Sequence, residues 1–523
     1  MRNLRGKRGF VFLSFLFLTV AFPGSGKAQE RKNLKGEVVY ATMYHQFGQR
    51  GGDPATHFLG AGPLISTTIF DGLVDRGPKV GDYRPALAES WRVADDLLSV
   101  EFRIRKGVKF HNGDGVTAED VKYSLDQYMR PELKSINLAI FKQYIRSIDV
   151  LDPYRVRVNL HQPWPGLFGR LWWLGGIFPK NYREKVGDAG FADKPVGAGP
   201  FRWVEYKQDV YWKGEAVENH YRKTPEFKTL KMVYVPEPST RLAMLKAGEA
   251  DIVLLHDSQI PQVKSDSSLR VVLNKNWQIV TLGFADLVFP NEPSPFHDLR
   301  VREAVSLAID RKAICEKILN SGADPWGDVH SQQTLGYDPA NQPDPYDPRK
   351  ARALLREAGY PNGFETKIHT AATWKRELEA VAANLAAVGI KAKLEVYEWG
   401  AWAAAHRGKK MRGLFRQHLT FNTDRHPGSQ LTTQQDPQSP WSYGLSTPEI
   451  NEIIAKSMHA KTDEDLMSFG KKLSKVMRER RANVILWSTS SGYGLGPRIA
   501  EWVHQESTYP CTAFEYLKVK EGK

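Results

Sequence analysis

The stretch Phe102-Arg-Ile-Arg-Lys-Gly-Val-Lys-Phe-His-Asn-Gly113, followed by Thr117-Ala-Glu-Asp-Val121, contains a strand, a turn and the start of a helix. Apolar and polar residues alternate over residues 99–105, which is the pattern of a half-buried β-strand. The next string is rich in Gly, Asn and Asp, which favour turns. Thr117 then precedes Asp120 by three residues, as in a capping box, so a helix is predicted to about Tyr128.

The same alternation of strands and helices recurs on both sides of this stretch, which predicts an α/β fold. Asp298, Asp310 and Asp347 mark predicted helix starts, and Asp347 precedes a proline at the first helical position. A chain of 523 residues exceeds one hydrophobic core, so we expect two or three lobes. The predicted strands are 38–43, 249–254 and 390–397. The predicted helices are 64–74, 239–248, 298–308, one starting at Asp310, 347–359, 377–388, 450–457 and 466–478.

The first residues have the composition of a secretion signal. Arg2, Arg5, Lys7 and Arg8 form a basic head, and an apolar run follows that is short for a membrane span. Small residues stand two apart at Gly26 and Ala28. We therefore expect residues 1–28 to be a signal peptide cleaved after Ala28, with an uncleaved anchor as the alternative.

Charge and cysteine content exclude two other classes of protein. The formal net charge of +14 is spread along the chain without a long basic run, which argues against nucleic-acid binding. Two cysteines, Cys315 and Cys511, are too few for a disulfide-dependent scaffold. A single disulfide between them and a buried free thiol at Cys315 both remain open.

No motif of catalysis is specific enough to predict an enzyme. The chain has no Gly-x-Ser-x-Gly elbow, no Walker loop and no His-Glu-x-x-His pair. His418 and His426 share one segment, but isolated histidines are more often core or solvated residues than metal ligands. We therefore expect no catalytic residue, no cofactor and no metal, and a hydrolase is the alternative from another class.

A series of motifs in order resembles family 5 of the extracellular solute-binding proteins, the dipeptide- and oligopeptide-binding family of ABC importers. The resemblance covers essentially all of the chain after residue 28. Beyond the opening stretch, its landmarks are Phe70-Asp-Gly-Leu-Val74, Pro85-Ala-Leu-Ala-Glu-Ser-Trp91, Gly197-Ala-Gly-Pro-Phe201, Leu245-Lys-Ala-Gly-Glu-Ala-Asp251, Asp298-Leu-Arg-Val-Arg-Glu-Ala304, Ala308-Ile-Asp-Arg311, Tyr346-Asp-Pro-Arg-Lys-Ala351 and Leu354-Leu-Arg-Glu-Ala-Gly-Tyr360.

The resemblance implies a two-lobed periplasmic-binding-protein fold, of the large type II-like class, with an extra inserted domain and a hinge. Closure around a solute is then a hinge motion. Carried onto this chain, the expected parts are lobe I at 29–75, 190–284 and 486–523, the inserted domain at 76–189, lobe II at 285–485, and a hinge at Trp277–Phe284 and Val484–Ser488.

The segment that reads the solute departs from the family pattern. Peptide-binding relatives carry a Trp and an Asp three apart, followed by Asp-Pro, and this Asp holds the peptide's amino terminus. Here Phe421 and Asp424 keep that spacing, while His426 replaces the acid before Pro427. Upstream, Arg416 suits a carboxylate or a phosphate and is joined by His418. The predicted ligand-binding residues are therefore Asp424, Phe421, Arg416 and His418, with an Asx turn as the alternative role of Asp424.

The resemblance implies capture of a peptide or peptide-like solute by a monomer in the periplasm. Its partners would then be the solute and the permease subunits of an ABC transporter in the inner membrane. An alternative within the same fold is a non-peptide solute, such as an opine, an anionic conjugate or a metal chelate held by His418 or His426.

Overall fold

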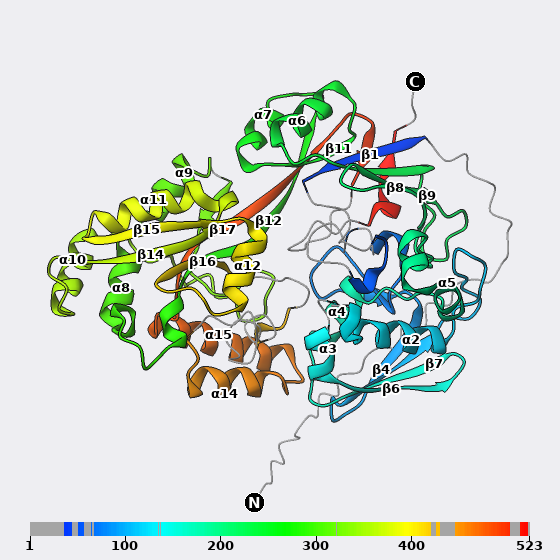
Figure 1. Ribbon diagram of the computed structural model, residues 1–523, viewed down its shortest axis with the longest axis horizontal. Helices are drawn as coiled ribbons and strands as arrows, with labels where there is room; N and C mark the ends of the chain where they lie inside the picture. The colour runs from blue at the N-terminus through cyan, green and yellow to red at the C-terminus, as the bar shows by residue number, and fades with distance from the viewer. Residues whose placement is uncertain are drawn as a thin grey trace, which may run out of the picture. The chain divides into compact units, whose positions relative to one another are not determined.

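The computed structural model describes residues 36–43, 51–56, 64, 67–133, 135, 138–320, 322–419, 425–428, 445–502 and 513–520 (Figure 1). The predicted signal peptide and the predicted ligand residues Phe421 and Asp424 lie outside these residues. Within the described part, no helix is both long enough and apolar enough to span a membrane.

A mixed sheet of eleven strands organises the described residues. Its order is β15-β14-β16-β12-β17-β11-β1-β10-β9-β8, and β13 pairs with β17 outside this path. Two runs of parallel strands, β15-β14-β16 and β11-β1-β10, are joined by antiparallel pairs, and this mixed sheet with its helices confirms the α/β prediction. The strands are β1 Glu37–Thr42, β8 Phe201–Lys207, β9 Tyr211–Ala216, β10 Thr229–Tyr234, β11 Ile252–Leu255, β12 Arg270–Phe284, β13 Ala323–Pro325, β14 Phe364–Ala371, β15 Ile390–Tyr397, β16 Leu414–His418 and β17 Asn483–Leu495.

A second, antiparallel sheet has the order β4-β5-β7-β6 and contains the strand of the opening stretch. Short pairs form from β2 with β3 and from β18 with β19. These strands are β2 Val74–Arg76, β3 Tyr83–Pro85, β4 Ala88–Val93, β5 Ser99–Ile104, β6 Ile145–Asp152, β7 Arg155–Leu160, β18 Ile499–Glu501 and β19 Lys518–Val519.

Four helices begin directly after the N-caps that the sequence predicts at Thr117, Asp298, Asp310 and Asp347, whereas the helix predicted to start at Ser239 or Thr240 begins at Pro238. The Asp310 carboxylate accepts a hydrogen bond from the Ala313 amide, and Asp120 accepts from both the amide and the hydroxyl of Thr117. The helices are α2 Ala118–Tyr128, α3 Leu138–Tyr144, α4 Leu167–Leu174, α5 Lys180–Asp193, α6 Pro238–Ala247, α7 Ile260–Lys264, α8 Leu299–Leu307, α9 Arg311–Lys317, α10 Pro348–Glu357, α11 Lys375–Ala386, α12 Trp399–Arg407, α14 Pro448–Ser457 and α15 Asp463–Glu479.

The helix predicted over residues 64–74 is wrong beyond Ile69. Tertiary hydrogen bonds hold the following backbone extended, because carbonyls of residues 69–73 accept from distant amides, including those of Ile177 and Gly199. Val74 then enters β2. A Cβ at Gly199 would overlap the carbonyl of Ile69, so this close approach requires glycine there.

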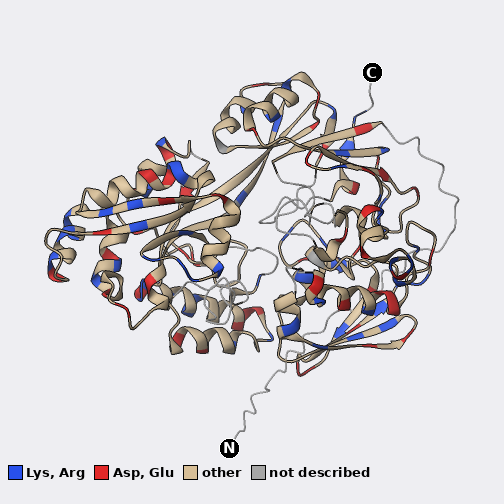
Figure 2. Cartoon of the chain, in the orientation of Figure 1, with Lys and Arg blue, Asp and Glu red and all other residues tan. Residues whose placement is uncertain are grey.

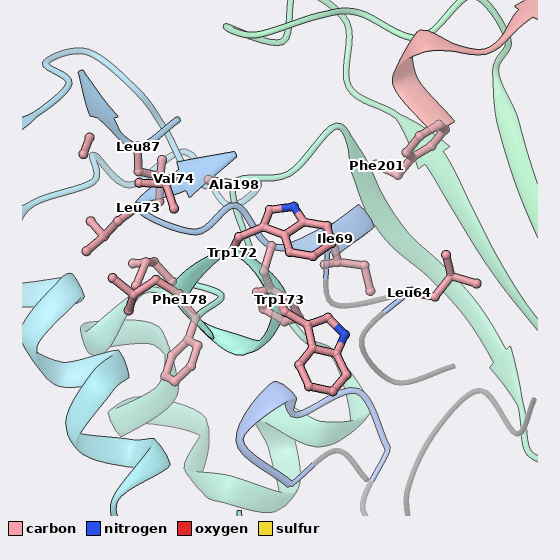
Figure 3. Close-up of a cluster of buried hydrophobic side chains, with 14 of the residues drawn as sticks. Leu64, Ile69, Leu73, Val74, Leu87, Trp172, Trp173, Phe178, Ala198 and Phe201 are labelled. Atoms are coloured by element: carbon pink, nitrogen blue, oxygen red, sulfur yellow. The ribbon is translucent and has the colours of Figure 1, made fainter. Parts of the chain in front are cut away.

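The apolar cores change along the two longest strands of the main sheet. Large aromatic side chains, including Trp172, Trp173 and Phe178, fill the core built around β1, β10 and the second sheet (Figure 3). The start of β12 and the end of β17 contact this aromatic core and the smaller core around β11. Val280 and Trp487, further along the same two strands, belong instead to the core around β14 and β15. The β12–β17 pairing is irregular between Asn274 and Gln278, close to this change.

Cys315 is a buried free thiol, which resolves one question that the sequence leaves open. Its side chain belongs to the core around β14. Burial raises the pKa of this thiol to about 12, so it stays protonated and unreactive. Cys511 lies outside the described residues.

Candidate functional site

Three parallel neighbours of the main sheet end at one edge. Strand β14 pairs in parallel with both β15 and β16, so their carboxyl ends at Ala371, Tyr397 and His418 face the same way. In open α/β sheets, ligands bind outside the carboxyl ends of the strands. The segments that follow these ends carry Trp374 and Trp399, together with the predicted ligand residues after β16.

Arg416, near the end of β16, is buried and already paired. Its side chain is 2% exposed, and its Nε lies 3.2 Å from Oε1 of Glu377 on α11. The guanidinium carbon lies 3.8 Å from the ring centre of Trp374, a cation–π contact. Since the Glu377 carboxylate already matches its charge, Arg416 packs against the face of the Trp374 ring and holds that ring in place.

Burial dominates the electrostatics of this pair and its neighbour. Burial raises the pKa of Glu377 against the opposing effect of Arg416, and it lowers the pKa of Arg416. His418 lies beside them, and burial together with Arg416 and His406 lowers its pKa to about 3. His418 is therefore neutral near neutral pH, and its Nδ1 accepts a hydrogen bond from Nη1 of Arg416 at 3.3 Å.

Three tryptophans form an aromatic cluster in front of Arg416. The rings of Trp399 and Trp402 stack with centroids 5.3 Å apart and an interplanar angle of 17°. Trp374 meets both rings edge-on, at 5.5 and 5.6 Å. Trp402 is buried, whereas Trp399 is 44% exposed and presents its ring outward. An exposed tryptophan fixed by two buried or half-buried ones is a preorganised apolar contact surface.

A second set of parallel strands leads to His256, whose pKa responds to a positive charge on α11. Strand β1 pairs in parallel with β10 and β11, and His256 follows the carboxyl end of β11. Burial lowers the pKa of His256, and the positive charges of Arg241 and Arg376 add to this effect. Arg376, on the first turn of α11, thus lies within electrostatic range of His256.

The four predicted ligand residues divide into two pairs. Arg416 and His418 are brought together behind Trp374, while Phe421 and Asp424 lie outside the described residues. Their role in binding stays a prediction. His426 uses both ring nitrogens on backbone groups, because Nε2 donates to the Ser457 carbonyl and Nδ1 accepts from the Gly428 amide. The described part of the chain contains no group of three side chains suited to a metal ion.

Sequence reasoning missed the aromatic cluster and Glu377. The i, i+3 spacing of Trp399 and Trp402 places them on one helix face and was a usable signal. Glu377 gave no such signal, since it lies 39 residues from Arg416.

Comparison with known proteins agrees with this architecture. Residues 82–439 match the bacterial extracellular solute-binding proteins, family 5 middle region. Heme-binding protein A of Haemophilus influenzae is 30% identical over 380 residues, which cover 67% of this chain and 69% of that protein. Glutathione-binding protein GsiB of Salmonella choleraesuis is 31% identical over 358 residues, covering 66% and 67%.

A solved structure extends the fold match to nearly the whole chain. The periplasmic binding protein DppA of Helicobacter pylori, in complex with the peptide STSA, has a TM-score of 0.80 at 23% identity. The match covers 94% of this chain and 99% of that one. The chain belongs to family 5 of the bacterial extracellular solute-binding proteins, the non-enzymatic solute-binding components of ABC transporters.

Proposed function

We propose that this protein captures a peptide or peptide-like solute and delivers it to the permease of an ABC importer. The observation that carries the proposal is that an exposed, stacked Trp399 and an exposed Arg376 follow the carboxyl ends of the parallel strands β15 and β14. Arg376 is exposed and has no ion-pair partner among the described residues. An aromatic surface and a free cation suit a solute that carries both an apolar side chain and a carboxylate.

A peptide has three groups that these residues would read. Arg376 would hold the carboxylate, Trp399 would contact a side chain, and Asp424 would pair with the amino terminus. The relative GsiB is named for binding glutathione, which is itself a tripeptide. Arg416 acts in this proposal through Trp374, with its own charge matched by Glu377.

Delivery requires that the solute stabilise one arrangement of two lobes. We propose the lobe boundaries expected from the sequence, with the hinge where β12 and β17 pass from one core to the other. The irregular pairing between Asn274 and Gln278 supports bending near that point. We also propose that the protein is a periplasmic monomer, exported by residues 1–28.

A thermal-shift screen tests the proposed ligand class. A ligand of the native state adds RT ln(1 + [L]/Kd) to stability, or about 2.7 kcal/mol at a hundredfold excess over Kd. We expect a clear rise in Tm with a member of a di- to pentapeptide set and recovery of that peptide unchanged. A set of opines, chelated nickel and hemin runs in parallel. A shift confined to this second set contradicts the peptide assignment and leaves solute capture standing.

A planar non-peptide solute is the second candidate. The stacked pair Trp399–Trp402 offers a flat face, and a 30% identical relative is named for binding heme. Hemin in the same screen separates this candidate from the first. A hemin shift that Trp399→Ala abolishes, with no response to peptides, favours it.

A further inference from the structure

A cavity of about 520 Å³ lies at the opposite ends of β14 and β15 from the aromatic cluster. Its lining comes from α10, from the turn before β14 and from the end of α11. Three of the lining side chains are the exposed Arg349, Arg352 and Arg356, and no carboxylate belongs to the described lining. The spacing i, i+3, i+7 places the three cations on one face of α10. Figure 2 shows where charged residues lie along this helix.

The neighbouring acids are engaged elsewhere. Glu303 pairs with Lys350 at 2.8 Å, and the charge of Glu357 acts on Arg300 of α8. Arg352 donates to the carbonyl of Ala387 at 3.1 Å. The guanidinium groups of Arg349 and Arg356 have no hydrogen-bond or ion-pair partner among the described residues.

A purely structural role accounts for only part of this charge. The cavity adjoins the C-termini of α10 and α11, and each helix C-terminus carries about half a negative charge. The three guanidinium groups carry three positive charges, against about one negative charge in total at the two helix ends. An excess of about two positive charges therefore remains. Several carbonyls of these ends are also already bonded, as the amides of Tyr360 and Gly389 donate to Leu355 and Ala386.

We propose that this arginine cavity binds a phosphate group. A phosphate monoester carries close to two negative charges near neutral pH, which matches the excess. Guanidinium groups bind phosphate oxygens through paired N–H donors, and Tyr360 and Asn362 add neutral polar groups to the wall. The phosphate group could come from a free phosphorylated solute or from the headgroup of an anionic lipid, since the chemistry is shared.

This site is distinct from the proposed solute site. The cavity residues Asn362 and Gly389 stand two and one residues before β14 and β15, whereas Trp374 and Trp399 follow the same strands. Each strand has eight residues, which separates its two ends by about 23 Å.

The test uses the double variant Arg349→Gln/Arg356→Gln, which spares the bond from Arg352 to Ala387. Isothermal titration with pyrophosphate and with inorganic phosphate measures the free-ligand arm. Co-sedimentation with phosphatidylglycerol vesicles, against phosphatidylcholine vesicles, measures the lipid arm. The matched control is Lys471→Gln/Lys472→Gln on α15, which removes the same charge at exposed positions.

We expect the double variant to lose at least tenfold affinity in one arm while the control keeps wild-type affinity. Loss in the titration assigns a free phosphorylated ligand, and loss in co-sedimentation alone assigns a lipid headgroup. If the arginine variant and the lysine control lose affinity equally, the effect depends on net charge alone and the proposal is overturned. Absence of binding in both arms overturns it as well. The apo Tm of the double variant should hold or rise, because like charges on one helix face are relieved.

Discussion

The two ends of β14 and β15 carry arginines in opposite electrostatic situations. At the carboxyl ends, Arg416 is buried, paired with Glu377 and covered by Trp374. At the amino ends, Arg349 and Arg356 are exposed and unpaired within the described part of the chain. The difference shows that an arginine's role depends on its partner. A matched arginine holds neighbouring rings in place, whereas an unmatched one is available to a ligand.

The largest expected effect comes from breaking the matched pair on one side. Glu377→Gln leaves the Arg416 charge buried without its counter-ion, which costs about 3–5 kcal/mol of unfolding free energy. Urea unfolding measures this loss. The control is Glu379→Gln on the same helix, where an exposed pair with Lys375 is broken and the change should stay within about 0.5 kcal/mol.

Replacing both partners sharpens the same point. Because burial outweighs pairing for both groups, Glu377→Leu/Arg416→Met should recover most of the stability lost in the single variant. A double variant as unstable as Glu377→Gln contradicts the view that the ion pair is costly to bury.

The next effect concerns the predicted amine anchor and is measured on ligand binding. Asp424→Asn keeps the side chain's shape and removes its charge, which costs about 2–5 kcal/mol when a buried charge pair is cut on one side. Affinity for the peptide found in the screen should fall at least about thirtyfold, with little change in apo Tm. Unchanged affinity with altered apo stability would instead indicate the Asx-turn role.

Acid should destabilise the carboxyl-end site through its buried histidines. Burial, with Lys409 and Arg407, lowers the pKa of His406 to about 3, and the unfolded value is near 6.5. As pH falls below 6.5 the unfolded chain takes up the proton first, so stability present above pH 6.5 is lost toward pH 3. A buried histidine with a pKa of about 3 lowers the free energy of unfolding by about 2 kcal/mol at pH 5. His406→Phe should flatten the pH dependence of urea unfolding; an unchanged slope contradicts the assignment.

The sequence predicted local structure well because its causes are local. Asp298, Asp310 and Asp347 each cap the amide two or three residues onward, and the structure confirms all three. The helix predicted through Val74 failed because distant amides bond to that backbone. For the same reason the sequence identified Arg416 as a charge and could not supply its partner on α11. Pairing across the sheet depends on the fold as a whole.

The most direct test of the account asks which end of β14 and β15 binds the transported solute. Isothermal titration of the solute found in the screen compares Trp399→Ala with Arg349→Gln/Arg356→Gln. We predict that Trp399→Ala lowers affinity about tenfold through lost apolar contact, equal to about 1.4 kcal/mol, while the arginine variant binds like wild type. Unchanged affinity in Trp399→Ala together with weakened binding in the arginine variant would contradict the assignment of solute capture to the carboxyl ends.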